Sequence, residues 1–105
     1  MIDSNTRGHK LLTREIEKTL PGLGATDGGG FDTIARVKFF TPDGAWTWLA
    51  TEYDPKEQLF FGYVLGLESE WGYFQLDELD AVRGQLGLPV ERDCHFIPSP
   101  VGELI

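Results

Sequence analysis

Residues 33–65 read TIARVKFFTPDGAWTWLATEYDPKEQLFFGYVL, and this stretch decides the fold. Apolar and polar residues alternate along much of it with a period of two, which is typical of β-strands. Thr41–Gly44 and Asp54–Glu57 interrupt the alternation with residues that favour tight turns. The sequence therefore predicts three antiparallel strands joined by two hairpin turns, over residues 33–40, 45–53 and 59–65.

Aromatic side chains are common on both faces of this predicted sheet. Trp46 and Trp48 share a face with Ala50, and the third strand is apolar on both faces, as expected for a central strand. Gly62, inside that strand, indicates a bulge or the close approach of another backbone. Two short helices are too small to hide all of this surface. Either the sheet curls on itself, or an aromatic patch remains exposed for a partner.

Helical patterns flank the strands on both sides. Apolar residues between Leu11 and Leu20 predict a helix over residues 13–20 with Thr13 as its N-cap. Asp77 is the expected N-cap of a second helix, over residues 78–84. Further strands are predicted over residues 71–75 and 90–97. The expected fold class is α+β, a small curled antiparallel sheet of about four to five strands with two short helices.

A chain of 105 residues fits one domain. Residues 1–10 are polar and are expected to be a frayed tail, followed by the α+β domain over residues 11–98. Pro98 and Pro100 are expected to end the ordered part, which leaves residues 99–105 as a C-terminal tail. The five glycines of residues 22–30 predict a flexible loop.

Targeting signals do not stand out in this sequence. Cys94 is the only cysteine, so an intramolecular disulfide is excluded. No apolar run reaches the roughly 18 residues that span a bilayer, and residues 1–10 lack the apolar centre of a signal peptide. We therefore expect a cytoplasmic protein that does not bind membranes.

The net charge of −8 is unevenly distributed. Residues 1–38 carry a charge of +1, whereas residues 39–105 carry −9. An acidic surface repels phosphate groups, so direct nucleic-acid binding is not expected, even through Arg7, Lys10, Arg14 and Lys18. The charge favours solubility, and it also suits a partner protein with a basic surface.

The sequence contains no recognisable catalytic or metal-binding motif. Cys94 and His95 are adjacent in a predicted strand, where neighbouring side chains point to opposite faces. No second cysteine completes a metal site, and the expected thiol is small and buried. The loop at residues 22–30 lacks the Gly-Lys-Ser/Thr ending of a phosphate-binding loop and precedes a strand. We expect no metal and no cofactor.

Acidic residues lie in pairs near predicted turns. Glu52 and Asp54 are two positions apart near the end of a strand, as are Glu68 and Glu70 in a connection. Paired carboxylates act as acid and base only where their environments separate their pKa values. Carboxylates near turns are expected to be solvated, so these residues are better candidates for an acidic binding surface.

Four stretches carry a resemblance to a known family: VKFFTPDGAWTW (37–48), LFFGYVLGLE (59–68), GYFQLDEL (72–79) and GLPVERD (87–93). In their order and spacing they resemble the uncharacterised bacterial family of domains of unknown function DUF2958, over roughly residues 10–98. The family has no established activity and implies no catalytic residues. The resemblance implies a small accessory protein carried by plasmids, conjugative elements or phages, often near anti-restriction genes.

The favoured function is a non-enzymatic protein-binding accessory protein of such a mobile element, which would inhibit a host or defence protein. An acidic protein can occupy a basic nucleic-acid channel by imitating phosphate charge. The candidate binding residues are Trp46, Trp48, Trp71, Glu52, Asp54, Glu57, Glu68 and Glu70.

Two alternatives remain open. A small-molecule-binding domain or enzyme would have a cleft that joins the aromatic sheet to a carboxylate or His95 with a shifted pKa. A homodimer would bury the face of Trp46 and Trp48 and remove the need for another partner.

Overall fold

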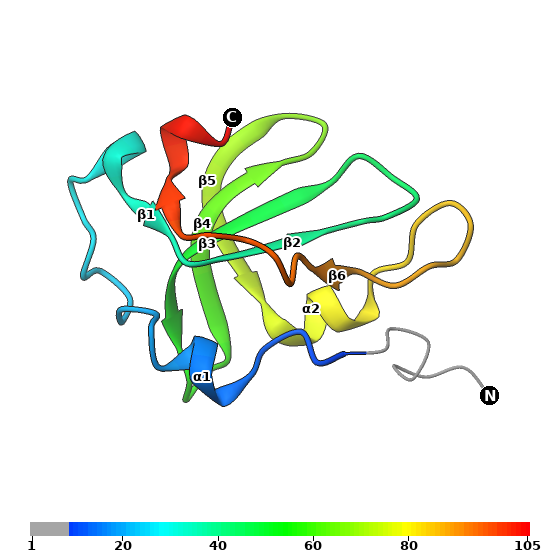
Figure 1. Cartoon of the computed structure of the whole chain (residues 1–105), viewed down its shortest axis with the longest axis horizontal. Coiled ribbons are helices and arrows are strands. Elements are labelled where there is room, and N and C mark those ends of the chain that lie inside the picture. Colours follow the sequence, from blue (N-terminus) through cyan, green and yellow to red (C-terminus); the bar gives the residue numbers. More distant parts are fainter. Residues whose placement is uncertain (1–8) are drawn as a thin grey trace.

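The structure is a computed structural model and describes residues 9–105. A five-stranded antiparallel sheet with the strand order β5-β4-β3-β2-β6 forms its centre (Figure 1). Its strands are β2 (Val37–Phe40), β3 (Thr47–Asp54), β4 (Leu59–Leu65), β5 (Ser69–Gln75) and β6 (Glu91–Arg92). A small second sheet pairs β1 (Ile34–Ala35) with β7 (Ser99–Pro100).

Two short α-helices and two 3-10 turns complete the fold. They are α1 (Arg14–Glu17), α2 (Leu76–Ala81), η2 (Gly30–Asp32) and η3 (Val101–Glu103). The predicted α+β class, with an antiparallel sheet of five strands and two short helices, is confirmed. No helix within residues 9–105 is long and apolar enough to cross a membrane.

Both helices differ in length or position from the sequence prediction. Thr13 caps α1 as predicted, because its Oγ1 accepts the N–H of Ile16 at 3.2 Å. The helix then ends at Glu17, in a turn that leads to Pro21. Helix α2 begins at Leu76, and Gln75 takes the N-cap position predicted for Asp77. The carboxylate of Glu78 accepts the Gln75 N–H at 2.8 Å, which completes a capping box.

A β-bulge in β3 shifts the alternation of side chains, so that residues after the bulge point to the opposite face from the one that a regular strand would give them. The register with β4 shifts between Ala50 and Glu52. Gly62 lies opposite Ala50, and a Cβ atom there would overlap the backbone of β3, which explains the glycine. Beyond the bulge, Tyr53 packs beside Phe60 on the same face as Ala50.

Two apolar clusters cover the two faces of the sheet. The larger contains Phe39, Trp48 and Phe60 of the sheet, and Leu79 of α2 packs against them. The smaller contains Ala35, Leu49 and Val101, with further partly buried residues around it. The helices therefore cover one face, and segments outside the helices cover the other.

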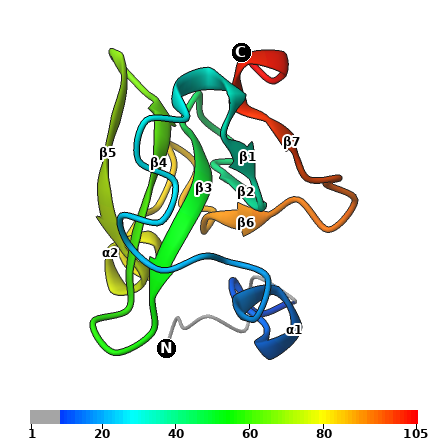
Figure 2. The same cartoon turned by 90° about the vertical axis from the view of Figure 1, so that its left-hand side faces the viewer.

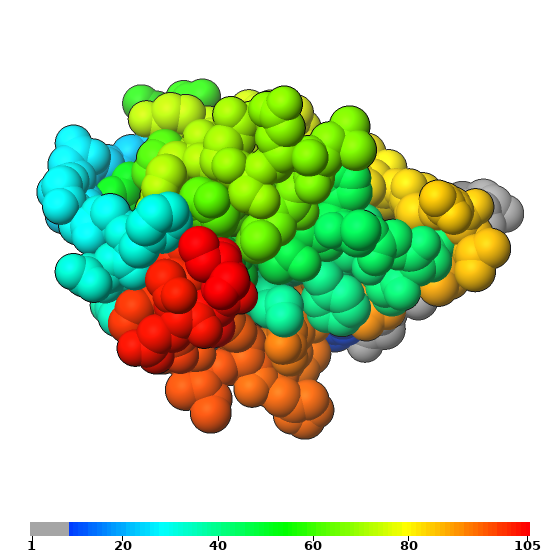
Figure 3. Space-filling model, turned by 90° about the horizontal axis from the view of Figure 1, so that it is seen from above, coloured from blue at the N-terminus to red at the C-terminus, as the bar shows by residue number. Residues whose placement is uncertain are grey.

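The C-terminal segment belongs to the domain, unlike the tail expected over residues 99–105. Strand β7 pairs with β1, and the Val101 side chain is completely buried. In Figure 3, the C-terminal residues (red) lie against the segment around residue 30 (cyan). The sequence prediction was wrong here because Pro98 and Pro100 end only the local strand pattern, while pairing with β1 depends on tertiary contacts.

At the other end of the chain, residues 1–8 of the expected N-terminal tail lie outside the described residues. His9 and Lys10 contact β6. The His9 Nε2 atom accepts the Arg92 N–H at 3.0 Å, and the Lys10 carbonyl accepts a hydrogen bond from the Arg92 guanidinium. This contact places the start of the domain along the edge of β6.

Candidate functional site

An apolar groove lies where Trp46 meets the segment that follows α2. It consists of two adjoining cavities, of about 340 and 470 Å³, which share Trp46, Trp48 and Val82 in their linings. Strands β4 and β5 and helix α2 line the first cavity. The turn before β3, the tip of the β4–β5 hairpin and residues 82–85 line the second. We call the two cavities together the Trp46 groove.

The two tryptophans differ sharply in exposure. Trp48 is 7% exposed and belongs to the larger core cluster, whereas Trp46 is 40% exposed. Their rings stack with centroids 5.9 Å apart. Gly66 lies beneath the Trp46 ring, and any side chain at that position would overlap it. Trp48 therefore supports the fold, and Trp46 presents aromatic surface to solvent.

Hydrogen bonds hold the turn next to Trp46 in place. The Trp46 N–H donates to Thr41 Oγ1 at 3.0 Å, and the Thr41 N–H donates to the Trp46 carbonyl at 3.0 Å. Asp43 in the same turn accepts the N–H groups of Leu86 and Leu88 at 2.6 and 3.3 Å. Two segments distant in the sequence are thus joined into one wall of the groove.

Exposed leucines surround this wall. Leu67 is 94% exposed at the tip of the β4–β5 hairpin, and Leu86 and Leu88 are exposed in the loop after α2. The space-filling view shows that loop (yellow to orange) beside the turn between β2 and β3 (Figure 3). Apolar side chains on a rim that can be reached by solvent are typical of a surface that binds another molecule.

Two carboxylates, those of Glu70 and Glu78, line the other side of the groove. In the strand register Trp48, Val64 and Glu70 lie in one row across β3, β4 and β5, so Glu70 shares the face of the tryptophan. Residues 66–80 contain five acidic and no basic side chains, and all five are exposed. Arg83 contributes a cation from the loop after α2.

The structure brings together only part of the predicted binding set. Trp46, Trp48 and Glu70 line the same cavity. Trp71 also borders it, but its ring contacts Phe31, Phe61 and Tyr63, and it shares a face with Tyr63. Glu68 is exposed beside Leu67.

Asp54 and Glu57 lie at the opposite end of the sheet. The register pairs Asp54 with Leu59, whereas the groove end of the same hairpin pairs Thr47 with Leu65. These two carboxylates therefore lie one strand length away from the Trp46 groove.

Glu52 is buried, contrary to the expectation of a solvated carboxylate. Its side chain is 2% exposed and accepts the N–H groups of Gly24 at 2.8 Å and Thr26 at 2.7 Å, together with the Thr26 hydroxyl. Burial by itself raises the pKa of Glu52, but the hydrogen bonds from Thr26 and Gly24 outweigh it and lower the pKa. The carboxylate is therefore an ionised anchor for the glycine-rich loop.

The bulge at Ala50 and Glu52 explains this difference, because it changes the direction in which Glu52 points. The sequence did contain a signal for this contact. Glu52 is a carboxylate within an apolar strand, and the glycine-rich loop has backbone N–H groups that require acceptors. Glu52 does not line the Trp46 groove. The buried carboxylate of Glu52 therefore does not face the aromatic wall of the groove.

Cys94 and His95 lie in the turn after β6 and do not continue a strand as predicted. Both are exposed, so the expected buried thiol is wrong. The His95 N–H donates to Asp93 Oδ1 at 3.0 Å, which stabilises the turn. No group of three His, Cys, Asp or Glu side chains suited to a metal ion occurs in the described part of the chain.

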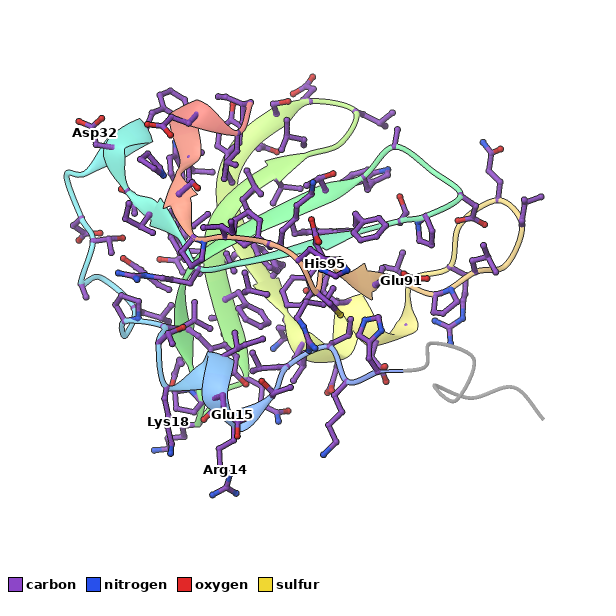
Figure 4. The ribbon with its side chains drawn as sticks, viewed as in Figure 1. Arg14, Glu15, Lys18, Asp32, Glu91 and His95 are labelled. Carbon is purple, nitrogen blue, oxygen red and sulfur yellow. The ribbon has the colours of Figure 1, made fainter. Side chains whose placement is uncertain are left out.

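Arg14 and Lys18 are separated from this turn, whereas Lys10 contacts Arg92 just before it. In Figure 4, Arg14 and Lys18 project outward from α1, while His95 and Glu91 lie near β6. Arg7 lies outside the described residues.

Comparisons with known proteins define the family of this chain. The profile of a family described as a protein of unknown function (DUF2958) matches residues 11–101. No curated protein matches the chain. No solved structure matches it. The matched residues include both the Trp46 groove and the loop anchored by Glu52, and the chain belongs to the DUF2958 family.

Proposed function

We propose that this chain is a non-enzymatic protein-binding accessory protein whose Trp46 groove receives apolar side chains from a partner with a basic surface. The observation that carries the proposal is a half-exposed tryptophan that lines an apolar groove with carboxylates on one side. Partly exposed tryptophans in pockets are frequent anchors of protein interfaces. The exposed carboxylates of residues 66–80 add charge complementarity, which favours basic partners and rapid association.

The resemblance suggests where such a partner is found. Small accessory proteins of plasmids, conjugative elements and phages act on components of the host cell, and we include this context in the proposal. The partner is then a host or defence protein of the cytoplasm, and the acidic side of the groove competes for its basic nucleic-acid surface.

Affinity capture with matched baits tests the proposal. Wild-type protein, Trp46→Ala, Glu70→Lys and the control Ile97→Ala are immobilised, and each is incubated with host lysate at low and high salt. Ile97 is 75% exposed and lines neither cavity of the groove, so its substitution controls for a general loss of apolar surface. Retained proteins are identified by mass spectrometry.

We expect one protein to be retained by the wild type and by Ile97→Ala at low salt. The same protein should be lost with Trp46→Ala, because the anchor is removed, and with Glu70→Lys, because the charge is reversed. High salt should weaken its retention by screening the carboxylates. Equal capture by the wild type and Trp46→Ala would show that the groove is not the binding site.

A further inference from the structure

Strand β5 forms an open edge of the central sheet. It is the first strand in the order β5-β4-β3-β2-β6, and in Figure 2 it lies at the outer margin of the sheet. All seven of its residues pair with β4 in an unbroken register from Ser69 to Gln75. It contains no proline and no lysine, the residues that commonly protect sheet edges.

The hydrogen bonds at both ends of this hairpin determine which groups face outward. The Leu76 N–H donates to the Gln58 carbonyl at 3.0 Å, and the Gly66 N–H donates to the Glu68 carbonyl at 3.2 Å. Opposite residues in antiparallel strands alternate between bonded and non-bonded pairs. Because Gln58 and Leu76 form a bonded pair at one end and Gly66 and Glu68 at the other, every second pair between them is also bonded. Glu70, Gly72 and Phe74 therefore bond to β4. The N–H and C=O groups of Trp71 and Tyr73 point to the open edge.

The outward groups at the two edges of the sheet differ in their partners. Glu78 accepts the outward N–H of Gln75 at the end of β5. On the opposite edge, His9 accepts the N–H of Arg92 in β6. Within the described chain, no hydrogen bond occupies the outward backbone groups of Trp71 and Tyr73. The middle of β5 therefore offers two donors and two acceptors in the geometry of a strand.

We propose that β5 receives an extended basic segment of the partner protein as a sixth strand of the sheet. This inference rests on the proposed function and specifies its binding mode. An added strand would bond to the backbone of Trp71 and Tyr73. Its alternate side chains would contact the exposed Tyr73 ring on one face and approach the Trp46 groove, past Glu70, on the other.

Charge selects this occupant over a second copy of the chain. The segment that contains β5, residues 66–80, has five exposed acidic and no basic side chains. Strand β5 itself carries one of these carboxylates, Glu70, and pairing it with a second β5 would bring the acidic segments of both copies close together, so that their mutual repulsion disfavours the pairing. A segment that alternates lysine with an apolar residue would instead neutralise the carboxylates and provide apolar contacts.

A defined peptide tests this inference without knowledge of the natural partner. The probe is a blocked peptide of alternating lysine and valine, which is titrated into isotope-labelled full-length protein and followed by NMR. We expect slower amide exchange at Trp71 and Tyr73 on binding. Tyr73→Pro removes the outward N–H without removing a bond to β4, and should weaken binding on the order of tenfold.

Two controls keep the test independent of the folding of the proline variant. The same peptide with a methyl group on every backbone nitrogen has no backbone N–H to donate to β5, so it cannot form the ladder and should not bind the wild type. A glutamate–valine peptide tests the charge. Equal binding of the N-methylated and unmodified peptides would overturn strand addition, as would a homodimer of the free protein that Tyr73→Pro dissociates.

The outcomes also separate this inference from the proposed function. Partner capture that depends on Trp46 but is unchanged in Tyr73→Pro would leave the groove as the binding site and exclude the strand edge. Peptide binding that depends on Tyr73, in a protein whose lysate capture does not depend on Trp46, would retain the edge and exclude the groove.

Discussion

At the scale of single residues, the Glu52 carboxylate connects the glycine-rich loop to the sheet. Three hydrogen bonds from Gly24 and Thr26 converge on a side chain that is almost fully buried. We expect Glu52→Gln to destabilise the fold by about 2 kcal/mol, because an amide oxygen replaces a charged acceptor and an amide NH₂ faces backbone donors. Urea unfolding measures this change, and Glu57→Gln, at an exposed turn, is the matched control.

The lowered pKa of Glu52 also predicts a pH dependence. The folded-state pKa lies below the ordinary value of 4.5, so the ionised carboxylate stabilises the folded state above that pH. This stability is lost as the pH falls through the folded-state pKa. The difference in unfolding free energy between the wild type and Glu52→Gln should therefore be constant near neutral pH and shrink in acid. A constant difference throughout would contradict this assignment.

Gly66 is another single residue with a specific role, because its lack of a side chain leaves room for the Trp46 ring. A methyl group at this position would overlap the indole ring, so Gly66→Ala should displace Trp46 from its stack on Trp48. We expect a changed near-ultraviolet circular dichroism spectrum and a loss of stability of about 1 kcal/mol from overpacking. Gly22→Ala is the control, because nothing lies within 4 Å of the added carbon there. Identical spectra for Gly66→Ala and the wild type would show that the ring contact is not formed.

At the scale of elements, the short C-terminal segment stabilises one face of the sheet. Val101 is completely buried in the smaller cluster with Ala35 and Leu49, although it follows two prolines. Val101→Ala should cost about 2 kcal/mol, because it removes buried methyl groups and leaves a cavity. Ile105→Ala should change stability by less than about 0.5 kcal/mol, because that side chain is 55% exposed. Equal effects would indicate that the segment does not pack as described.

The elements also show how far local patterns determine structure. The hairpin turns, the β4 strand from Leu59 to Leu65 and the Thr13 cap follow from short-range signals, and the sequence predicted them. The end of α2 at Ala81 was not predicted, because Val82 continues the apolar pattern of a helix. Asp43 instead holds the loop after α2 by bonding to Leu86 and Leu88, which are far from it in the sequence.

At the scale of the whole molecule, β3 contributes to the clusters on both faces. Trp48 belongs to the larger cluster, and its neighbour Leu49 belongs to the smaller, in which Trp71 also packs. Loss of one cluster should therefore destroy the other, and the chain should unfold in a single transition. Trp48→Phe removes the tryptophan fluorescence that comes from the larger cluster's Trp48, and Trp71→Phe removes that of Trp71 beside the smaller cluster. The midpoints measured by fluorescence and by circular dichroism should coincide within each variant, whereas separate midpoints would indicate independent faces.

The local patterns of the sequence were sufficient to predict the hairpins, their turns and the α+β class, because strand, turn and helix preferences depend on near neighbours. The sequence also singled out Trp46, Trp48 and Glu70, which line one cavity. Only the folded chain determined that Trp48 is buried and Trp46 open, that Glu52 turns inward, and that residues 99–105 cover the second face. These features depend on a register shift in one strand and on contacts between distant segments, which no local pattern contains.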